Sequence, residues 1–392
     1  MGTIFTRKII ILLILTLLFC SNSFLNGSTQ DKSQKHLYPG EEIVFANNYP
    51  SLIKFINGNP NKPLVVFNPG FAFLARIAYG YPGGKQQDFL SFWLHKAGYP
   101  FLGVSYPLEN PVYSKVYPSM GVTDWGKMVA DITKKCIQKN GLTSRVIFLG
   151  WSMGGTVAAA LNKAAIKNGL QVEMFVSIAS LPPRPGIYSS NTTDFVTMAK
   201  NGLINIKPLN RLFLKDMELQ NNINSHVIIP ENIFLSQIVG NLPIGLMGTA
   251  LRYKNGKWTK DLGEALKDSD SVNMWNFPLP AIVRNSGFHS APDTTESSYF
   301  NTFDWGPIMV RKLFQMFRKS TKWENITDRQ FSKIEFVSKT GPEHLTKSVY
   351  GTHFFFVGEQ GAKNTARAIS ELDIIVQNYE FEAECYSKLS TK

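Results

Sequence analysis

Short apolar runs alternate with segments of helical spacing through most of this chain. Four runs consist largely of apolar residues, as expected for strands buried on both faces of a parallel sheet; they span residues 63–67, 100–105, 145–149 and 172–179. The segments between them repeat apolar residues every three or four positions, as in helices that pack through one face; they span residues 86–96, 124–139 and 154–167. This alternation predicts an α/β fold, with a mostly parallel central sheet and helices on both of its faces.

The pattern extends on both sides of this region. Residues 43–46 and 52–56 are strand-like runs separated by a turn at 47–50. Towards the other end, a strand, a helix, a last strand and a closing helix are expected at residues 279–283, 305–317, 333–337 and 360–376.

Residues 181–277 interrupt the alternation. This insert opens with Pro182-Pro183-Arg184-Pro185-Gly186 and contains an apolar stretch at 233–251. A long insertion after a core strand is typical of a lid or cap over a binding site. The apolar stretch has two interpretations, a roof over a lipophilic pocket or a segment packed against the core.

The N-terminus has the pattern of a secretory signal peptide. Arg7 and Lys8 precede an apolar run at 9–19, and small polar residues follow. The run is shorter than the roughly 20 residues that span a bilayer, and cleavage after Ser23 is expected. A lipoprotein signal with Cys20 as the lipidated residue is the alternative, although bulky Phe19 stands where a small residue is usual. An uncleaved anchor is the third interpretation.

The composition is that of a globular protein, with 44% hydrophobic and 18% charged residues. The formal net charge of +12 falls by two, to +10, when residues 1–23 are removed, because they contain Arg7 and Lys8 and no acid. A basic balance favours anionic membranes or acidic partners, so peripheral membrane association is one expectation. The basic residues are scattered, however, and the densest stretch, 311–322, has the pattern of one helix face. No nucleic-acid-binding motif accompanies the charge, and no nucleic acid or obligate protein partner is expected.

Cysteine is scarce in the chain. Besides Cys20, only Cys136 and Cys385 are present. Two cysteines cannot form a disulfide framework or a zinc site, although a single bridge between them is open. No metal or organic cofactor is expected.

The decisive motif is Gly150-Trp151-Ser152-Met153-Gly154, which follows the run at 145–149 and precedes an alanine-rich helical segment. A G-x-S-x-G motif between a strand and a helix is the context of a nucleophile elbow, a sharp turn that exposes a serine hydroxyl. The glycines are needed because the turn leaves no room for side chains beside the serine. The helix start also directs backbone N–H groups towards a developing oxyanion. We therefore predict Ser152 as a nucleophile; the alternative is an ordinary glycine-rich turn.

With the G-x-S-x-G motif between a strand and a helix, residues from about 40 to 380 resemble the α/β-hydrolase family of serine esterases, lipases and thioesterases. The resemblance is weakest across the insert. That family has its second oxyanion donor in a loop after the third strand, and the matching segment is Phe67-Asn68-Pro69-Gly70-Phe71. The resemblance implies that the backbone N–H groups of Phe71 and Met153 form the oxyanion hole. Pro69 stands where the family often has histidine, and a plain type II turn at Pro69-Gly70 is the alternative.

The resemblance also implies a catalytic histidine between the last core strand and the last helix. His353, in Tyr350-Gly351-Thr352-His353-Phe354, has that position, and the chain order serine, aspartate, histidine then holds. His344, nine residues earlier, is the main alternative. The other histidines lie in the segment after the signal, in a surface helix, in the insert and after the penultimate strand: His36, His95, His226 and His289.

The catalytic acid of the family follows the penultimate core strand, expected here at 280–283. Its usual place is three residues beyond a glycine, but that position counted from Gly287 is Ser290. Asp293 is the first acid after the strand and is the predicted third member of the triad. The next acids along the chain are Glu296 and Asp304.

These features predict an exported serine hydrolase, periplasmic or extracellular, that cleaves a small-molecule or lipid ester or a thioester through an acyl-enzyme. Acyl transfer to another alcohol and peptide cleavage use the same machinery and stay open. A hydrolase-like binding protein without activity is the alternative from a different class. The expected segments are a signal peptide, a flexible lead-in, a first core part, the insert as a lid or cap, a second core part and a tail: residues 1–23, 24–40, 41–180, 181–277, 278–380 and 381–392.

Overall fold

The computed structural model describes residues 36–183, 197–287, 298–319 and 326–389. The predicted signal peptide and most of the lead-in fall outside these residues, as do His289 and Asp293. Within the described ranges, no helix is long and apolar enough to cross a membrane.

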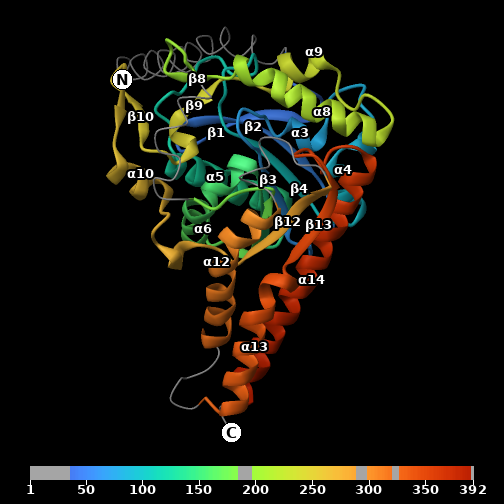
Figure 1. Cartoon of the computed structure of the whole chain (residues 1–392), viewed down its shortest axis with the longest axis vertical. Helices are drawn as coiled ribbons and strands as arrows, with labels where there is room; N and C mark the ends of the chain where they lie inside the picture. The colour runs from blue at the N-terminus through green and yellow to red at the C-terminus, as the bar shows by residue number, and fades with distance from the viewer. Residues whose placement is uncertain (1–35, 184–196, 288–297, 320–325, 390–392) are drawn as a thin grey trace, which may run out of the picture.

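An eight-stranded sheet forms the centre of the protein, in the order β1-β2-β4-β3-β5-β6-β12-β13 (Figure 1). The pairs β1–β2 and β2–β4 are antiparallel, and the pairs from β4 to β13 are parallel. Every residue of β3 and β4 is buried, as their apolar sequences require. The predicted α/β class with a mostly parallel sheet is confirmed. The strands are β1 (Glu41–Ala46), β2 (Tyr49–Ile56), β3 (Leu64–Asn68), β4 (Phe101–Ser105), β5 (Arg145–Trp151), β6 (Gln171–Ile178), β12 (Pro280–Gly287) and β13 (Thr346–Gly351).

The first two strands form a tight hairpin. Ala46 pairs with Tyr49, so the connecting loop has only two residues, Asn47 and Asn48. Their φ angles are +48° and +66°. Two positive φ angles define a type I′ turn, in which asparagine is favoured because it tolerates the left-handed region.

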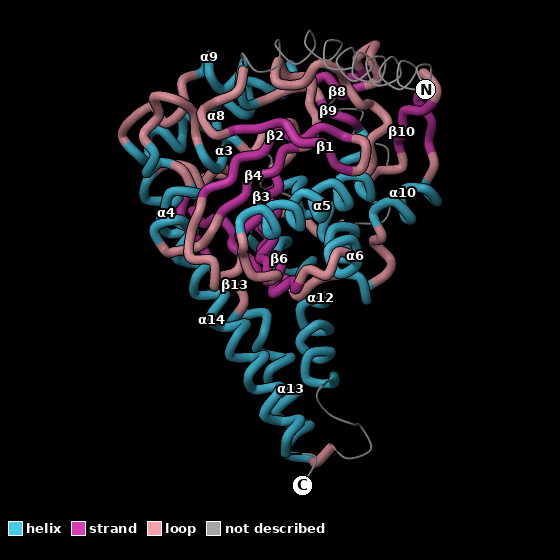
Figure 2. Tube along the Cα trace, turned by 180° about the vertical axis from the view of Figure 1, so that it is seen from behind, coloured by secondary structure: helices cyan, strands magenta, loops and turns pink. Residues whose placement is uncertain are grey.

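Helices cover both faces of the sheet (Figures 1 and 2). On one face α5 and α6 pack against each other; on the other, α14 (Glu359–Leu389) packs along α4 and against β6, β12 and β13. Gly141 ends α5 with a φ of +61°, in the left-handed region that glycine favours at the end of a helix. The core helices before the insert are α3 (Arg76–Tyr79), η1 (Gln86–Asp88), α4 (Leu90–Lys96), α5 (Val122–Asn140), η2 (Ser152–Val157) and α6 (Ala158–Lys167).

The described part of the insert forms two small sheets and several helices between β6 and β12. It lies along the loops that follow β3 and β4, because Phe73 pairs with Val239 and Glu109 with Asn241 in isolated bridges. Its elements are β7 (Thr197–Met198), β8 (Leu203–Asn205), η3 (Lys207–Leu209), α8 (Asn210–Asn224), α9 (Glu231–Ile233), the π-helix η4 (Phe234–Ile238), β9 (Leu242–Pro243), η5 (Ile244–Met247), β10 (Leu251–Lys254), β11 (Lys257–Lys260), α10 (Leu262–Ser269) and η6 (Met274–Asn276).

The apolar stretch of the insert is packed into the protein. Five of its large apolar side chains have no exposed surface, namely those of Phe234, Ile238, Leu242, Ile244 and Leu246, and the others are at least partly buried. Of the two interpretations of residues 233–251, this burial favours the segment packed against the core.

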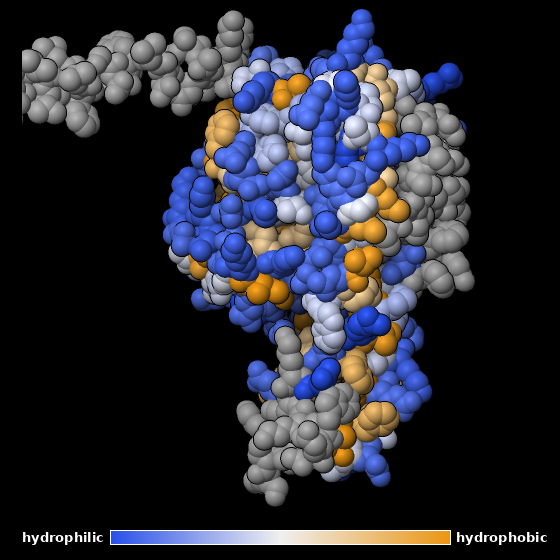
Figure 3. Space-filling view, turned by 90° about the vertical axis from the view of Figure 1, so that its left-hand side faces the viewer, coloured by the Kyte–Doolittle hydropathy of each residue, from blue (hydrophilic) through white to orange (hydrophobic). Residues whose placement is uncertain are grey.

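Three long helices, α12 (Ser298–Lys319), α13 (Asp328–His344) and α14 (Glu359–Leu389), extend beyond the sheet (Figure 1). We call α12, α13 and the second half of α14 the helical arm. The Phe317 and Tyr386 rings lie 6.1 Å apart, and Lys333 forms an ion pair with Glu382 at 3.3 Å, so the three helices pack together. The face shown in Figure 3 is mostly hydrophilic where it is coloured, with apolar side chains scattered over it and down the arm.

The expected strand at 333–337 is wrong, because these residues lie inside α13. Thr327 and Gln330 cap this helix reciprocally, and Ile334, Val337 and Gly341 are buried at helical spacing. The last strand is instead β13. The chain after residue 380 also differs from the expected tail, since α14 continues to Leu389.

Candidate active site

Ser152 lies at the sharp turn between β5 and the helix that follows it. Its φ is +52°, a value that side chains disfavour, and only 9% of its surface is exposed. A Cβ on Gly154 would lie 2.6 Å from the Asn68 carbonyl oxygen, and one on Gly150 would lie 2.6 Å from the Gly154 carbonyl oxygen. Both positions therefore require glycine. The turn has the features of a nucleophile elbow, with backbone strain stored at the serine.

The first turn after the elbow is tighter than an ordinary α-helix. The sequence predicts a helix from residue 154, but the chain forms the 3₁₀-helix η2 from Ser152 before α6 begins at Ala158. Met153 is the second residue of η2. The N–H groups in the first turn of a helix have no partner within the helix, so they can bind an anion at its N-terminus.

The loop after β3 touches the elbow. A Cβ on Gly70 would lie 2.9 Å from the Ser152 Cβ, so no side chain separates the two segments. The Phe73 N–H donates to the Gly70 carbonyl at 3.3 Å, and Ala72 has a φ of +71°. Gly70 is not among the residues of positive φ, so a type II turn with Gly70 at its third position is excluded. The turn instead spans Gly70 to Phe73.

The Tyr106 hydroxyl fixes this loop on both sides of Phe71. It donates to the Gly70 carbonyl at 2.6 Å and accepts from the Ala72 N–H at 2.9 Å. Tyr106 is fully buried, and this burial raises the pKa of its hydroxyl far above the usual range, so the proton stays in place. Tyr106 follows β4 directly and was not singled out from the sequence, because its partners lie 36 and 34 residues away in the chain.

His353 lies beside the elbow, two residues after β13. Its carbonyl accepts a hydrogen bond from the Trp151 Nε1 at 3.1 Å, and its ring centroid is 5.3 Å from that of Trp151. Trp151 directly precedes Ser152, and His353 is only 6% exposed. The structure thus places His353 against the residue that precedes Ser152, although the two segments come from opposite ends of the core.

The other described histidines lie elsewhere. His344 is at the end of α13, where its Nδ1 lies 2.6 Å from the Tyr379 hydroxyl. His95 contacts the Asn57 carbonyl, and His226 pairs with Asp88 at 2.7 Å. The His36 carbonyl accepts a hydrogen bond from the Arg76 guanidinium. Among the described histidines, His353 is the one that lies against Trp151 of the Ser152 turn.

Comparison with protein-family profiles finds no match, and neither does comparison with curated proteins. Among solved structures, a thermophilic esterase from Thermogutta terrifontis is 14% identical, with 86% of this chain and 98% of that chain covered and a TM-score of 0.45. A thioesterase domain from the curacin biosynthetic pathway is 11% identical, with 85% and 98% covered and a TM-score of 0.37. An E-2-(acetamidomethylene)succinate hydrolase is 12% identical, with 85% and 98% covered and a TM-score of 0.41.

The chain has the α/β-hydrolase fold. The mostly parallel sheet, the strained serine turn after β5 and a histidine after the last strand are its features here.

The third member of the predicted triad is Asp293, which lies outside the described residues. The penultimate core strand, β12, ends at Gly287, six residues before Asp293 in the sequence. Most buried carboxylates among the described residues have partners away from Ser152: Glu41 with Arg76, Asp88 with His226, Glu173 with Arg145 and Asp373 with Tyr99. Asp216, 1% exposed on α8, is a further buried carboxylate that the sequence analysis did not consider.

Aromatic rings from the core and the insert surround the turn at Ser152. The Phe73 ring lies 4.9 Å from Trp151, 5.2 Å from Phe213 and 5.6 Å from each of Phe234 and Phe354. Phe213 and Phe234 belong to the insert. The side of the elbow next to Trp151 is therefore apolar and covered by the insert.

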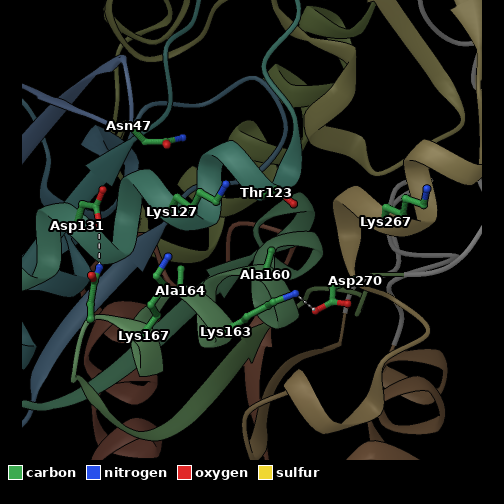
Figure 4. Close-up of a pocket in the computed structure, with 11 residues that line it drawn as sticks. Asn47, Thr123, Lys127, Asp131, Ala160, Lys163, Ala164, Lys167, Lys267 and Asp270 are labelled. Atoms are coloured by element: carbon green, nitrogen blue, oxygen red, sulfur yellow. Dashed lines mark hydrogen bonds and ion pairs between the residues drawn. The ribbon is translucent and has the colours of Figure 1, made fainter.

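A separate cavity of about 670 Å³ opens between α5, α6 and α10, away from Ser152 (Figure 4). Four lysines line it together with Asp131 and Asp270. Asp270 lies 3.6 Å from the Lys163 ammonium, and Asp131 accepts from the Asn168 amide at 2.8 Å. These lysines are exposed, which agrees with the basic surface expected from the composition. Across the described ranges, no His, Cys, Asp and Glu side chains gather as a metal site.

Cys136 and Cys385 are both free. Cys136 is buried in α5, and burial raises the pKa of its thiol to about 12. Cys385 lies in the helical arm. The bridge that the sequence left open does not form.

Proposed function

We propose that this protein is an exported serine hydrolase that cleaves carboxylic esters through an acyl-enzyme. The observation that carries the proposal is the strained backbone of Ser152, at φ +52°, with His353 held against the neighbouring Trp151. Strain of this kind persists where the surrounding structure over-determines it, as at a nucleophile.

In the proposed reaction, the Ser152 hydroxyl oxygen attacks the acyl carbonyl carbon while the His353 imidazole takes its proton. The negative charge that develops on the carbonyl oxygen is stabilised by the N–H groups of Phe71 and Met153. Loss of one such donor costs about 10²- to 10³-fold in rate. His353 then returns the proton to the leaving alcohol. Water repeats the sequence on the acyl-enzyme, which releases the acid and restores Ser152.

Asp293 is the proposed acid that orients His353 and stabilises its charged form. Asp293→Asn should lower kcat by about 10⁴-fold, the effect of a wrong histidine tautomer. The matched comparison is Asp216→Asn. If Asp216→Asn abolishes turnover and Asp293→Asn does not, the acid comes from the insert.

The substrate is proposed to be an ester with an apolar acyl group, because aromatic rings flank the elbow next to Trp151. The leaving group is open, and acyl transfer to an alcohol uses the same steps with the alcohol in place of water. Turnover of a panel of esters of increasing acyl length, with and without an added alcohol acceptor, separates these activities.

A fluorophosphonate probe tests the nucleophile directly. Wild-type protein should be labelled, Ser152→Ala should not, and Ser236→Ala, which changes an exposed serine of the insert, should be labelled like wild type. Activity should collapse in His353→Ala and persist in His344→Ala. Folded wild-type protein that takes up no label would instead support the inactive binding protein.

Export rests on residues 1–23. Mass spectrometry of the mature chain should find an N-terminus at Phe24. A lipid-modified Cys20 at the N-terminus would mean a lipoprotein, and an intact Met1 in mature protein would mean an uncleaved anchor.

A further inference from the structure

Helix α8 of the insert lies on the segment that carries His353. We call residues 352–357, between β13 and α14, the histidine loop. Gln220 of α8 is fully buried and reaches both ends of this loop. Its Nε2 donates to the Val357 carbonyl at 2.7 Å, and its Oε1 accepts from the Thr352 N–H and the Thr352 hydroxyl, each at 3.3 Å.

The histidine loop itself is tightly folded between these two points. The Phe354 N–H donates to the Thr352 hydroxyl oxygen at 3.1 Å, and the Phe355 N–H to the Thr352 carbonyl at 3.0 Å. The Val357 N–H donates to the Phe354 carbonyl at 2.8 Å. A displacement of Thr352 or Val357 is therefore passed on to the residues between them, which include His353.

Little space separates α8 from the loop. A Cβ on Gly351 would lie 3.0 Å from the Gln220 Oε1, and a side chain at position 358 would collide with Asn224 of α8. A buried amide group costs free energy unless it is hydrogen-bonded. If α8 moved off the loop, Gln220 and the Val357 carbonyl would both lose their partners. The docking of α8 and the position of His353 are thus linked by the same hydrogen bonds.

We propose that Gln220 is a positioning residue, which holds His353 in its working place by fixing both ends of the histidine loop. The insert is then part of the catalytic apparatus, since the enzyme works at full rate only while α8 is docked. This inference rests on the proposed hydrolase function, with His353 as the base.

The test uses Gln220→Met, which keeps the length of the side chain and removes its hydrogen bonds, and Gln220→Glu, which loses the donor to Val357 when ionised. Asn222→Ala is the control, because Asn222 is on the exposed face of the same helix. Fluorophosphonate labelling rates, kcat, KM and melting temperature are measured for each variant from pH 5 to 9.

For Gln220→Met we expect kcat and the labelling rate to fall together by about 10- to 100-fold, the cost of a misplaced catalytic group. KM should stay within about two-fold, because substrate contacts are unchanged. For Gln220→Glu, the activity relative to wild type should recover as pH falls, because the protonated acid again donates to the Val357 carbonyl. Asn222→Ala should match wild type.

The proposal is overturned if folded Gln220→Met has the labelling rate, kcat and pH profile of wild type. It is also overturned if both Gln220 variants fail to fold while Asn222→Ala folds, since Gln220 would then serve the fold alone. Absence of labelling in the wild type is a different result, which removes the proposed function and leaves the contacts of Gln220 as structure only.

Discussion

The backbone of Ser152 adopts a conformation that glycine accepts and other residues resist. A residue with a side chain in this region costs about 1–2 kcal/mol relative to the right-handed region. We predict that Ser152→Gly unfolds with a free energy about 1 kcal/mol higher than Ser152→Ala, although neither variant is active. Urea unfolding of the two variants measures the difference. Equal stabilities would mean that the turn at residue 152 relaxes once the hydroxyl is gone.

Tyr106 is the second residue whose role can be isolated. Tyr106→Phe removes the hydroxyl between Gly70 and Ala72 and should cost about 1–3 kcal/mol in stability, because two buried backbone groups lose their partner. It should also lower kcat about 10-fold with little change in KM, because the Phe71 N–H would be held less firmly against the oxyanion.

Tyr99→Phe is the matched control for Tyr106→Phe. Its hydroxyl is also buried, and it donates to Asp373 of α14 at 2.7 Å rather than to the loop after β3. We expect a similar loss of stability with kcat unchanged. If both variants lower kcat equally, the effect of Tyr106 is one of general stability.

Some residues of the site belong to a motif in the local sequence, and others do not, for a physical reason. Ser152 is found because the strand, the glycines and the helix that shape its turn are adjacent in the chain. Tyr106 and Gln220 are missed because they act through backbone groups 36 and 137 residues away. A hydrogen bond to a distant carbonyl or N–H leaves no pattern in the local sequence.

At the scale of elements, the buried strands and their crossover helices were predictable, whereas helix α13 and strand β13 were not. The five residues Lys333 to Val337 contain three apolar residues, which suit either a short strand or part of a helix. Tertiary packing decides, since α13 buries Ile334 and Val337 and leaves Phe336 55% exposed. The real last strand, β13, is an edge strand with little apolar character, so its sequence gives a weak signal.

The docking of α8 should depend on pH through His226. The hydrogen bond to buried Asp88 raises the pKa of His226 above its usual range, because the pair favours the charged imidazole. Lys85 and Glu359 are the other charges next to it. The pair stabilises the folded state fully below the ordinary histidine pKa of about 6.5, and this contribution is lost as pH rises through the raised pKa.

We therefore predict that wild-type protein loses up to about 1 kcal/mol more stability between pH 6 and pH 9 than His226→Gln does. Urea unfolding at a series of pH values measures this loss. His95→Gln, in which a histidine outside the insert is changed, should follow the wild-type curve. Parallel curves for wild type and His226→Gln would show that the ion pair with Asp88 does not hold the insert.

At the scale of the whole molecule, the helical arm is the feature that the sequence indicates least. Helices at 305–317 and 360–376 were expected, but their extension past the sheet depends on α13, which packs against both, with contacts such as that of Lys333 with Glu382. The arm joins the sheet near Arg145, whose guanidinium pairs with Glu173 at 2.6 Å. The charges of Arg145 and Glu173 also act on the carboxyl group of Glu380 in α14.

Burial raises the pKa of Glu380 to about 7, and the nearby charges of Glu173 and Asp373 add to this effect while Arg145 opposes it. The folded state thus disfavours the ionised carboxylate, and its stability falls as pH rises from the ordinary glutamate pKa to about 7.

We therefore predict that Glu380→Gln has the free energy of unfolding of wild type near pH 4.5 and exceeds that of wild type by about 1 kcal/mol at pH 8, after allowance for solvent screening. Thermal unfolding at both pH values measures this difference. Glu384→Gln changes an exposed carboxylate one turn further along α14 whose charge contributes least to the raised pKa of Glu380, so it should show a much smaller dependence on pH. A stability gain for Glu380→Gln that is equal at both pH values would mean that packing, and not charge, limits the attachment of the arm.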